Sequence, residues 1–161
     1  MKSITQHINQ VIHGDVLATL KTFPSNSIDC VITSPPYWQL RDYGWRGQWG
    51  LEKTYEEYLE HLWTFMDEIK RVLKPTGTAW INLGDTYGTQ SGTGNGKVYR
   101  SQSTKHHVTN GALLKKGKLA HKCQLLLPHR FAIGCTERGW ILRNDIIWAK
   151  PNGIPDFVKK K

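Results

Sequence analysis

The sequence predicts an α/β fold with a mainly parallel sheet and a C-terminal antiparallel hairpin. Apolar runs of strand length alternate with helical segments, and this β-α-β-α-β order implies right-handed crossovers between parallel strands. The apolar run over residues 28–33 is continuous rather than alternating, which is typical of a strand buried on both faces. A length of 161 residues fits one domain with one core.

The first predicted elements form a strand–helix–strand unit. Residues 10–15 predict a short strand that ends in a Gly-Asp turn, and residues 16–23 predict a short helix with an apolar face. Loop residues 24–27 separate this helix from the strand at 28–33. An aromatic, glycine-rich loop over residues 40–53 comes next.

A long amphipathic helix is predicted from about Tyr55 to Leu73. Thr54 is suited to the N-cap, and Glu57, three residues later, completes a capping box. Apolar residues recur at helical spacing, and basic residues near the C-terminal end suit the helix dipole. The Pro-Thr-Gly segment at 75–77 is expected to end the helix, and residues 78–83 to form the third strand.

The C-terminal elements are a helix and a hairpin. Residues 124–138 predict a helix that ends at Gly139. Residues 140–143 and 146–148 are apolar and would pair across Asn144-Asp145 as the antiparallel hairpin. A helix or a continuous strand is the alternative for the last segment.

The charge of the chain is one-sided, with 22 Lys and Arg against 13 Asp and Glu, a net charge of +9 and a pI near 9.6. Residues 89–122 hold no acidic side chain, and we interpret them as a flexible basic loop that contacts DNA phosphates. A basic loop without a partner is the alternative. The cations assigned to DNA contacts are Lys97, Arg100, Lys105, Lys115 and Lys116.

Composition excludes several other classes of protein. Hydrophobic residues make up 39% of the chain and are too scattered for a membrane span, and no secretory signal pattern opens it. The three cysteines form no CxxC pair, and no cysteines or histidines have ligand spacing, so neither disulfides nor a metal site is expected. A reduced, cytoplasmic protein is therefore predicted.

The most informative motif is Ser34-Pro35-Pro36-Tyr37, which directly follows the strand at 28–33. Consecutive prolines stop strand pairing and fix a rigid, extended exit. Ligands of open α/β sheets bind at the carboxyl ends of strands, which is where this motif lies. An ordinary strand-ending loop or a proline-rich ligand segment is the alternative.

This motif resembles motif IV of the amino-methyltransferases that modify exocyclic nitrogens of DNA bases, and its Ser-Pro-Pro-Tyr form is most similar to the N4-cytosine branch. The resemblance implies a Rossmann-like fold, S-adenosylmethionine as methyl donor, double-stranded DNA as substrate and a restriction-modification or phage context. N6-adenine methylation and a non-catalytic DNA-binding remnant are the alternatives. The resemblance assigns catalysis to Ser34, Pro35, Pro36 and Tyr37, and cofactor contacts to Asp15, Thr33 and Ser34.

The chemistry of an exocyclic amine explains why such a turn is useful. The amine is a poor nucleophile because its lone pair is delocalised into the ring, so acceptors around its two N–H bonds would favour the reactive geometry. The Ser34 hydroxyl and the Pro35 carbonyl are such acceptors, and Tyr37 can stack on a base rotated out of the duplex. Alignment would supply most of the rate.

Further residues have competing interpretations. The resemblance adds Trp38, Asp85, Trp148 and Asn152 to the substrate-binding residues. For Asp15, helix capping is nearly as good an interpretation as cofactor contact. For Asp85, helix capping or turn formation is as good an interpretation as base binding. The aromatic residues of the 40–53 loop either contact DNA or pack beneath the loop; they are Tyr43, Trp45 and Trp49.

C5-cytosine methylation is excluded by the cysteines. That chemistry needs a nucleophilic cysteine, normally presented after a proline. Cys30 lies within the strand at 28–33, and Cys123 has no preceding proline.

The resemblance covers residues 14–152, and in this β-class arrangement the catalytic half comes first. The main cofactor-binding half, with its Phe-x-Gly-x-Gly loop, would follow, and no such loop occurs here. We therefore expect an incomplete S-adenosylmethionine site in a truncated or split enzyme. The strand at 28–33 would become a sheet edge open to a complementary methyltransferase chain or to a homodimer partner.

Overall fold

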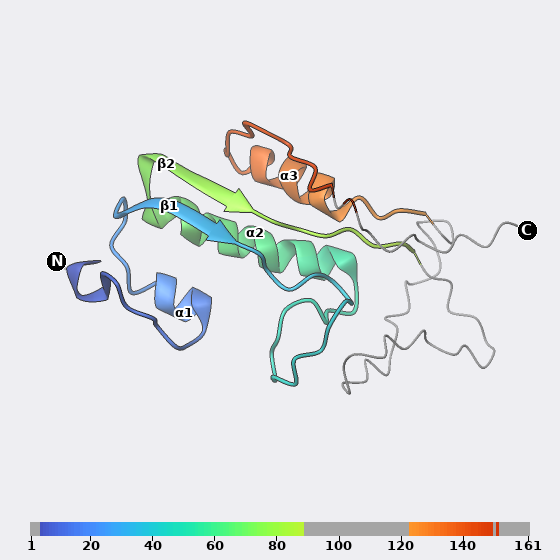
Figure 1. Cartoon of the computed structure of the whole chain (residues 1–161), viewed down its shortest axis with the longest axis horizontal. Helices are drawn as coiled ribbons and strands as arrows, with labels where there is room; N and C mark the ends of the chain where they lie inside the picture. Colours follow the sequence, from blue (N-terminus) through green and yellow to red (C-terminus); the bar gives the residue numbers. More distant parts are fainter. Residues whose placement is uncertain (1–3, 89–122, 150, 152–161) are drawn as a thin grey trace, which may run out of the picture.

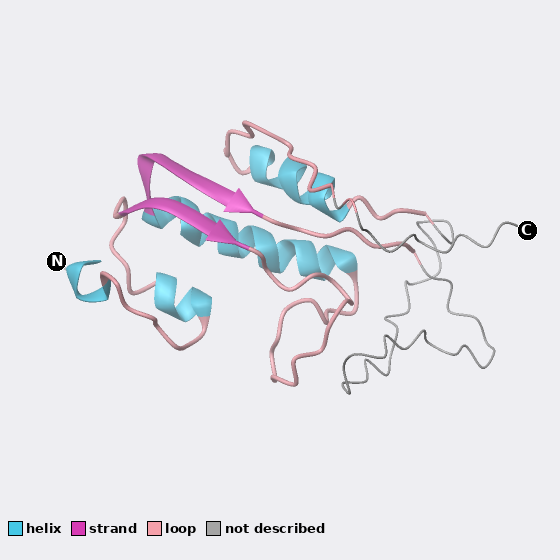
Figure 2. Ribbon diagram, viewed as in Figure 1, coloured by secondary structure: helices cyan, strands magenta, loops and turns pink. Residues whose placement is uncertain are grey.

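The computed structural model describes residues 4–88, 123–149 and 151. In these residues the chain is α/β, as predicted (Figures 1 and 2). The elements in chain order are η1 (Ile4–His7), α1 (Val16–Leu20), β1 (Ile28–Thr33), α2 (Tyr55–Val72), β2 (Leu73–Ile81) and α3 (Leu127–Glu137).

Strands β1 and β2 form a two-stranded parallel sheet, with Ile32 opposite Trp80 and Thr33 opposite Ile81. The connection between them contains α2, which lies along one face of the sheet (Figure 1). The Asn82 amide donates to the Thr33 carbonyl over 2.9 Å. The two strand ends are therefore held together where the Ser34-Pro35-Pro36-Tyr37 turn begins.

The predicted N-cap of α2 is confirmed. The Thr54 side chain accepts a hydrogen bond from the Glu57 amide over 3.2 Å. The Glu57 carboxylate accepts from the Lys53 amide over 3.1 Å, one residue before the position that a standard capping box uses. The helix ends at Val72, one residue earlier than expected.

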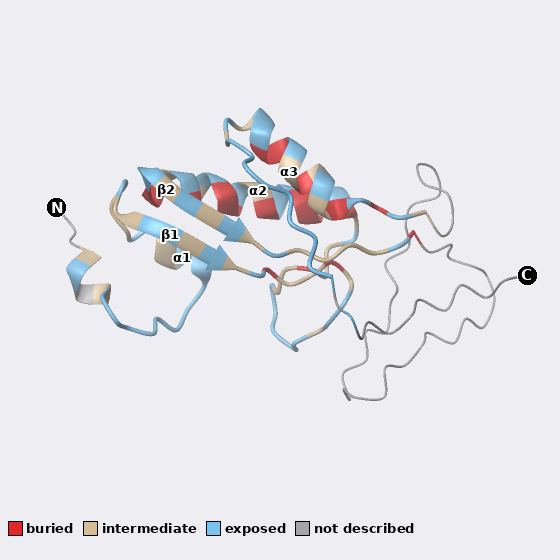
Figure 3. Cartoon of the chain, turned by 45° about the horizontal axis from the view of Figure 1, so that its top comes forward, coloured by how far each residue is buried: buried red, intermediate tan, exposed pale blue. Residues whose placement is uncertain are grey.

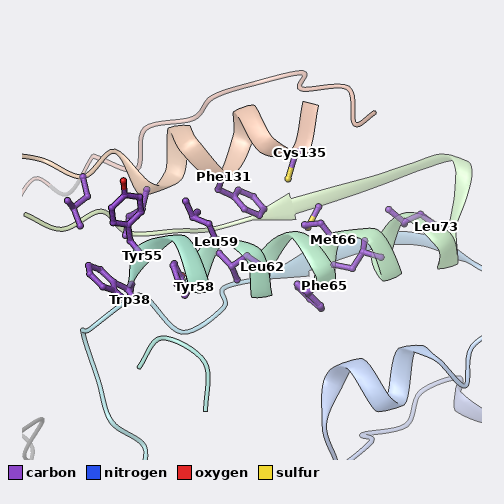
Figure 4. Close-up of a cluster of buried hydrophobic side chains, with 13 residues drawn as sticks. Trp38, Tyr55, Tyr58, Leu59, Leu62, Phe65, Met66, Leu73, Phe131 and Cys135 are labelled. Carbon is purple, nitrogen blue, oxygen red and sulfur yellow. The ribbon is translucent and has the colours of Figure 1, made fainter. Parts of the chain in front are cut away.

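The hydrophobic core lies along α2, between the sheet and α3 (Figures 3 and 4). Leu62 and Ile69 of α2 are completely buried, and Phe131 and Cys135 of α3 face the same cluster. Gly134 has no side chain because one would overlap the Trp63 ring, so the two helices approach closely. The indole N–H of Trp63 donates to the Phe131 carbonyl over 3.1 Å.

The two faces of the sheet differ in burial. Val31, Ala79 and Ile81 pack against the core, whereas Ile32 is 80% exposed and Trp80 is 53% exposed. The prediction that residues 28–33 are buried on both faces is therefore wrong within the described residues, because only one face of β1 is covered. Among those residues β1 has a single strand neighbour, so its expected edge position is confirmed.

The predicted first strand and the predicted C-terminal hairpin are not formed. Residues 10–15 are irregular and exposed, and residues 140–149 contain no strand, so the C-terminal hairpin is not present. Residues 141–149 are all exposed. A two-stranded hairpin without a packing surface is marginal in water, which accounts for the difference.

Several element boundaries also differ from the predictions. Helix α1 ends at Leu20 rather than Phe23, and α3 begins at Leu127, with Pro128 in its first turn. Strand β2 begins at Leu73 and includes residues 75–77, which were expected only to end the preceding helix. The predicted basic loop at 89–122 lies outside the described residues. No helix in the part of the chain that the structure describes is long and apolar enough to cross a membrane.

Candidate active site

A pocket of about 300 Å³ lies beside the turn that follows β1. The turn supplies Ser34, Pro35, Pro36 and Tyr37, and the next loop completes the lining with Leu40, Arg41 and Tyr43. All four residues assigned to catalysis therefore border one cavity, at the carboxyl end of a parallel strand. This is the position at which α/β sheets bind ligands.

Tyr58 of α2 holds the second proline of the turn. Its hydroxyl donates to the Pro36 carbonyl over 2.9 Å, and the residue is 1% exposed. Burial raises the pKa of Tyr58 far above its ordinary value, and the nearby Glu52 carboxylate and Tyr37 add to the shift. The phenol therefore stays a neutral hydrogen-bond donor and fixes the direction of the Pro-Pro segment.

The Pro35 carbonyl has no such partner: no described residue donates a hydrogen bond to it. The Ser34 hydroxyl lies 3.4 Å from the Tyr37 hydroxyl, which is long for a bond between two hydroxyl groups. A bound ligand can therefore displace this weak contact at little cost. Both acceptors that the sequence predicted for an amine are available.

The Tyr37 ring lies against the backbone that follows β2. A Cβ atom placed on Gly84 would come within 2.7 Å of the ring atoms Cδ2 and Cε2 of Tyr37. Only glycine leaves room for the ring in this position. Gly84 therefore lies against the Tyr37 ring, although it does not itself line the pocket.

Glu52 connects the 40–53 loop to the turn and to α2. Its carboxylate accepts from the Gly50 amide over 2.8 Å and meets His61 Nδ1 at 2.8 Å. Its backbone carbonyl accepts from the indole N–H of Trp38 over 3.1 Å and from the Gln39 side chain over 3.0 Å. The loop is therefore fixed at its C-terminal end.

Trp38, which was predicted to bind substrate, is buried in the core and does not line the pocket. It is 4% exposed, belongs to the core and meets the Tyr55 ring edge-on at 6.3 Å between ring centroids. Its polar N–H is satisfied by Glu52, so burying the large apolar ring leaves no unpaired donor. Trp38 therefore packs in the core directly after the turn.

Asp85 caps α3, which was the alternative interpretation of this residue. Its carboxylate accepts from the amides of Leu126, Leu127 and Thr86, each over 2.9 Å. Leu126 precedes the helix in a left-handed conformation with φ 56°, and its own side chain provides no cap. Asp85 supplies that cap from a distant part of the sequence, so its carboxylate is already engaged.

The remaining predicted residues lie elsewhere. Asp15 caps α1 by accepting from the Ala18 amide over 2.8 Å, as its alternative interpretation held. Thr33 and Trp148 do not line the pocket, and Trp148 is 74% exposed. Outside the described residues lie Lys97, Arg100, Lys105, Lys115, Lys116 and Asn152. Within the residues that the structure describes, no group of three His, Cys, Asp or Glu side chains is arranged to hold a metal ion.

Sequence reasoning missed three residues of the site. Leu40 and Arg41 line the pocket, and Tyr58 positions Pro36. The Leu-Arg-Asp-Tyr segment directly after the motif was a usable signal, because residues that follow a strand-end turn commonly border its crevice. No local signal marks Tyr58, whose partner lies 22 residues earlier in the chain.

Comparison with known proteins defines the class. Residues 28–161 match the family model for N6 and N4 methyltransferases, which is described as DNA methylase. The chain therefore belongs to this family of DNA methyltransferases.

Three of its relatives are Type II methyltransferases. M.Cfr9I of Citrobacter freundii and M.XycI of Xanthomonas campestris pv. cyanopsidis are each 40% identical over 153 residues, which cover 94% of this chain and 49% of the relative. M.SmaI of Serratia marcescens is 37% identical over 155 residues, which cover 94% of this chain and 51% of the relative. The chain spans about half the length of the curated relatives it matches. No solved structure gives a significant match.

Proposed function

We propose that this chain supplies the base-binding and amine-orienting part of a DNA methyltransferase that modifies the N4 nitrogen of cytosine within a restriction-modification system. The observation that carries the proposal is the pocket beside the turn, in which the Ser34 hydroxyl and the Pro35 carbonyl are available next to the Tyr37 ring. Membership of the family and the Type II methyltransferase relatives support it.

The described side chains act on the amine of the target base. Ser34 Oγ and the Pro35 carbonyl oxygen each accept a hydrogen bond from one N–H group of the amine. This arrangement directs the lone pair of the amine nitrogen away from the two acceptors. Tyr37 stacks on the ring of the base. Gly84 leaves room for the Tyr37 ring, and Tyr58 holds the Pro-Pro segment in place. Holding the amine in one orientation lowers the entropic part of the barrier.

The target base must leave the DNA helix to reach the pocket, because its amine is paired and stacked in duplex DNA. A net charge of +9 favours approach to the phosphate backbone. Double-stranded DNA is accordingly the proposed macromolecular substrate. The cations proposed to contact it at 89–122 keep the role that the sequence indicates.

S-adenosylmethionine, the methyl donor that this family implies, would supply an electrophilic methyl group. Of the three residues predicted to contact it, only Ser34 borders the pocket, and Asp15 is engaged in capping α1. The proposal is accordingly that the described residues form only part of the cofactor site. We propose that the rest of this site comes from polypeptide that packs beside β1.

The proposed partner is a complementary methyltransferase chain, with a second copy of this chain as the alternative. Among the described residues β1 has one free edge, and the apolar Ile32 and Trp80 lie exposed on the uncovered face. A parallel strand with unpaired N–H and C=O groups is a template for pairing. Sedimentation of the pure chain distinguishes the two partners, since only self-pairing makes it dimerise alone.

Two other functions remain candidates. The family includes N6-adenine enzymes, and the two acceptors of the turn suit the adenine amine equally well. A DNA-binding remnant without catalysis is favoured by the incomplete set of cofactor contacts described above. The methylated nucleoside that is formed, or its absence, distinguishes both candidates from N4-cytosine methylation.

The experiment is a chimera in which this chain replaces the matched segment of M.Cfr9I. DNA incubated with the chimera and S-adenosylmethionine is digested to nucleosides, which are separated by mass. N4-methyldeoxycytidine supports the proposal, N6-methyldeoxyadenosine supports the adenine candidate, and neither product supports the remnant. Ser34→Ala should lower the rate roughly tenfold or more, because one amine acceptor is lost.

A further inference from the structure

The pocket has a second wall that the assigned catalytic residues do not provide. Leu40, Arg41 and Tyr43 line the same cavity as the Ser34–Tyr37 turn. They belong to the loop between β1 and α2, which extends away from the sheet (Figure 1). The position of this wall depends on how firmly the loop is held.

Gln48 braces the wall from inside the loop. Its side-chain oxygen accepts from the Tyr43 amide over 2.6 Å, and its side-chain nitrogen donates to the Arg41 carbonyl over 2.7 Å. The Asp42 carboxylate accepts from the Gly44 amide over 2.7 Å, which closes a local turn. The backbone that carries Arg41 and Tyr43 is therefore tied on both sides of Asp42.

The ends of the loop are attached to the core and to the turn. The Trp49 ring packs edge-on against Phe65, with centroids 5.5 Å apart. The Gln39 amide donates to the Gly50 carbonyl over 2.7 Å, and the Leu40 amide to the Tyr37 carbonyl over 3.3 Å. The second wall is thus fixed relative to the turn that holds Tyr37.

The Arg41 guanidinium differs in its contacts from those of Arg71 and Arg138. Arg71 and Arg138 each form salt bridges with carboxylates of α2. Within the described residues, by contrast, no acidic side chain or carbonyl accepts a hydrogen bond from Arg41, although it borders a cavity. Its five N–H donors suit a bidentate contact with a phosphate.

Tyr43 offers a second aromatic surface to the same cavity. Its side chain is 53% exposed, and its backbone rather than its ring is held by Gln48. A base that stacks on Tyr37 would have this ring available on another side. Aromatic rings bind bases of any sequence because every base has a π-face.

We propose that Arg41 binds the phosphate of the nucleotide whose base enters the pocket, while Tyr43 packs against that base opposite Tyr37. The choice of a nucleotide as ligand rests on the proposed function. The roles of Arg41 and Tyr43 rest on the presence of one unpaired guanidinium and two phenol side chains around a cavity of about 300 Å³. The pocket volume lies at the lower end of the range for small-molecule sites.

The same loop provides matched controls. Arg46 and Trp45 are exposed and lie within the loop, yet neither lines the pocket. Arg46, like Arg41, forms no salt bridge or side-chain hydrogen bond within the described residues. Replacing Arg41 or Arg46 therefore removes a guanidinium, and replacing Tyr43 or Trp45 removes an aromatic ring, from inside or outside the proposed site.

The test measures binding of deoxycytidine 5′-monophosphate and of deoxycytidine to the full chain by isothermal titration. The monophosphate should bind more tightly, and Arg41→Gln should weaken it roughly tenfold, the effect expected for a charge-assisted hydrogen bond, without changing deoxycytidine binding. Tyr43→Ala should weaken both ligands about fivefold or more, because stacking on the base is lost. Arg46→Gln and Trp45→Ala should change neither affinity.

The proposal is overturned if the chain fails to bind the monophosphate, or if Arg41→Gln has no larger effect than Arg46→Gln. Circular dichroism of each variant ensures that a lost fold is not mistaken for a lost contact. Arg41-dependent nucleotide binding without methylated product from the chimera would contradict the proposed function alone. Methylated product with unchanged nucleotide binding by Arg41→Gln would contradict this inference alone.

Discussion

The two faces of the β1–β2 sheet differ in how far the rest of the described chain covers them. On one face, α2 covers Val31, Ala79 and Ile81 and forms the core with α3. On the other face, Ile32 and Trp80 are more than half exposed. The covered face also positions the candidate site, because Tyr58 of α2 holds Pro36. Stability and site geometry therefore come from one side of the sheet, and the other side is available to a partner.

The largest expected effect compares the two faces directly. Leu62→Ala should lower the free energy of unfolding by about 2–5 kcal/mol, because the side chain is completely buried beneath the covered face. Ile32→Ala should change the stability of the chain alone by less than about 0.5 kcal/mol, because the side chain is 80% exposed. Urea denaturation followed by circular dichroism measures both. Equal losses would contradict the one-sided core.

A smaller effect is expected where α3 joins the covered side. Asp85→Ala should lower the unfolding free energy by about 2 kcal/mol, because three backbone amides lose their acceptor. Asp85→Asn, which keeps one acceptor oxygen, should lose less. If Asp85 acted only on a substrate base, both variants would be as stable as the original chain in the same denaturation measurement.

The next effect tests how the covered face holds the turn. Tyr58→Phe should cost about 1 kcal/mol, because the Pro36 carbonyl loses its only side-chain donor among the described residues. Tyr87→Phe is the control, since Tyr87 is half exposed and its hydroxyl makes no hydrogen bond within the same residues. Thermal and urea unfolding should show a lower stability for Tyr58→Phe than for Tyr87→Phe. Identical stabilities would show that the hydroxyl contributes nothing to the turn.

The smallest effect concerns pH and the contact between α2 and α3. Burial raises the pKa of the Cys135 thiol to about 12, and Arg138 opposes the shift. The folded chain keeps this proton while the unfolded chain releases it, so stability is fully present below the ordinary thiol pKa and falls as pH rises above it. From about pH 8 to pH 9 the loss should be about 0.7 kcal/mol.

Cys135→Ala isolates this thiol from other groups that titrate in the same range. The variant should be less stable throughout, because a buried side chain is shortened, but its stability should fall less steeply with pH. Urea midpoints at several pH values measure the two slopes. Parallel slopes would contradict a buried, protonated Cys135.

Local chemistry made part of the structure predictable. Thr54 and Glu57 marked the start of α2, and the Pro-Pro pair placed the turn at the end of β1. These features depend on neighbouring residues, so one sequence is sufficient to find them. The predicted strands at 10–15, 140–143 and 146–148 failed because a strand depends on pairing with a neighbour, which sequence pattern alone does not reveal.

The site was predictable only as far as its motif. Ser34 and Tyr37 were found from their place after a strand, but the second wall at Arg41 depends on Gln48, seven residues away in the loop. Trp38 was assigned to the substrate although Glu52, 14 residues later, satisfies its N–H and allows it to be buried. Contacts of this kind arise from the loop conformation and leave no periodic signal in the sequence.

The central claim is that the turn after β1 forms the pocket for the target base. Photocrosslinking of the full chain to single-stranded DNA that carries 5-iododeoxycytidine tests it most directly, because the linkage forms where the base lies. Mass spectrometry of the digested adduct should locate the linkage at Tyr37 or Tyr43, both of which line the pocket. Linkage confined to residues outside 34–43 would contradict the account.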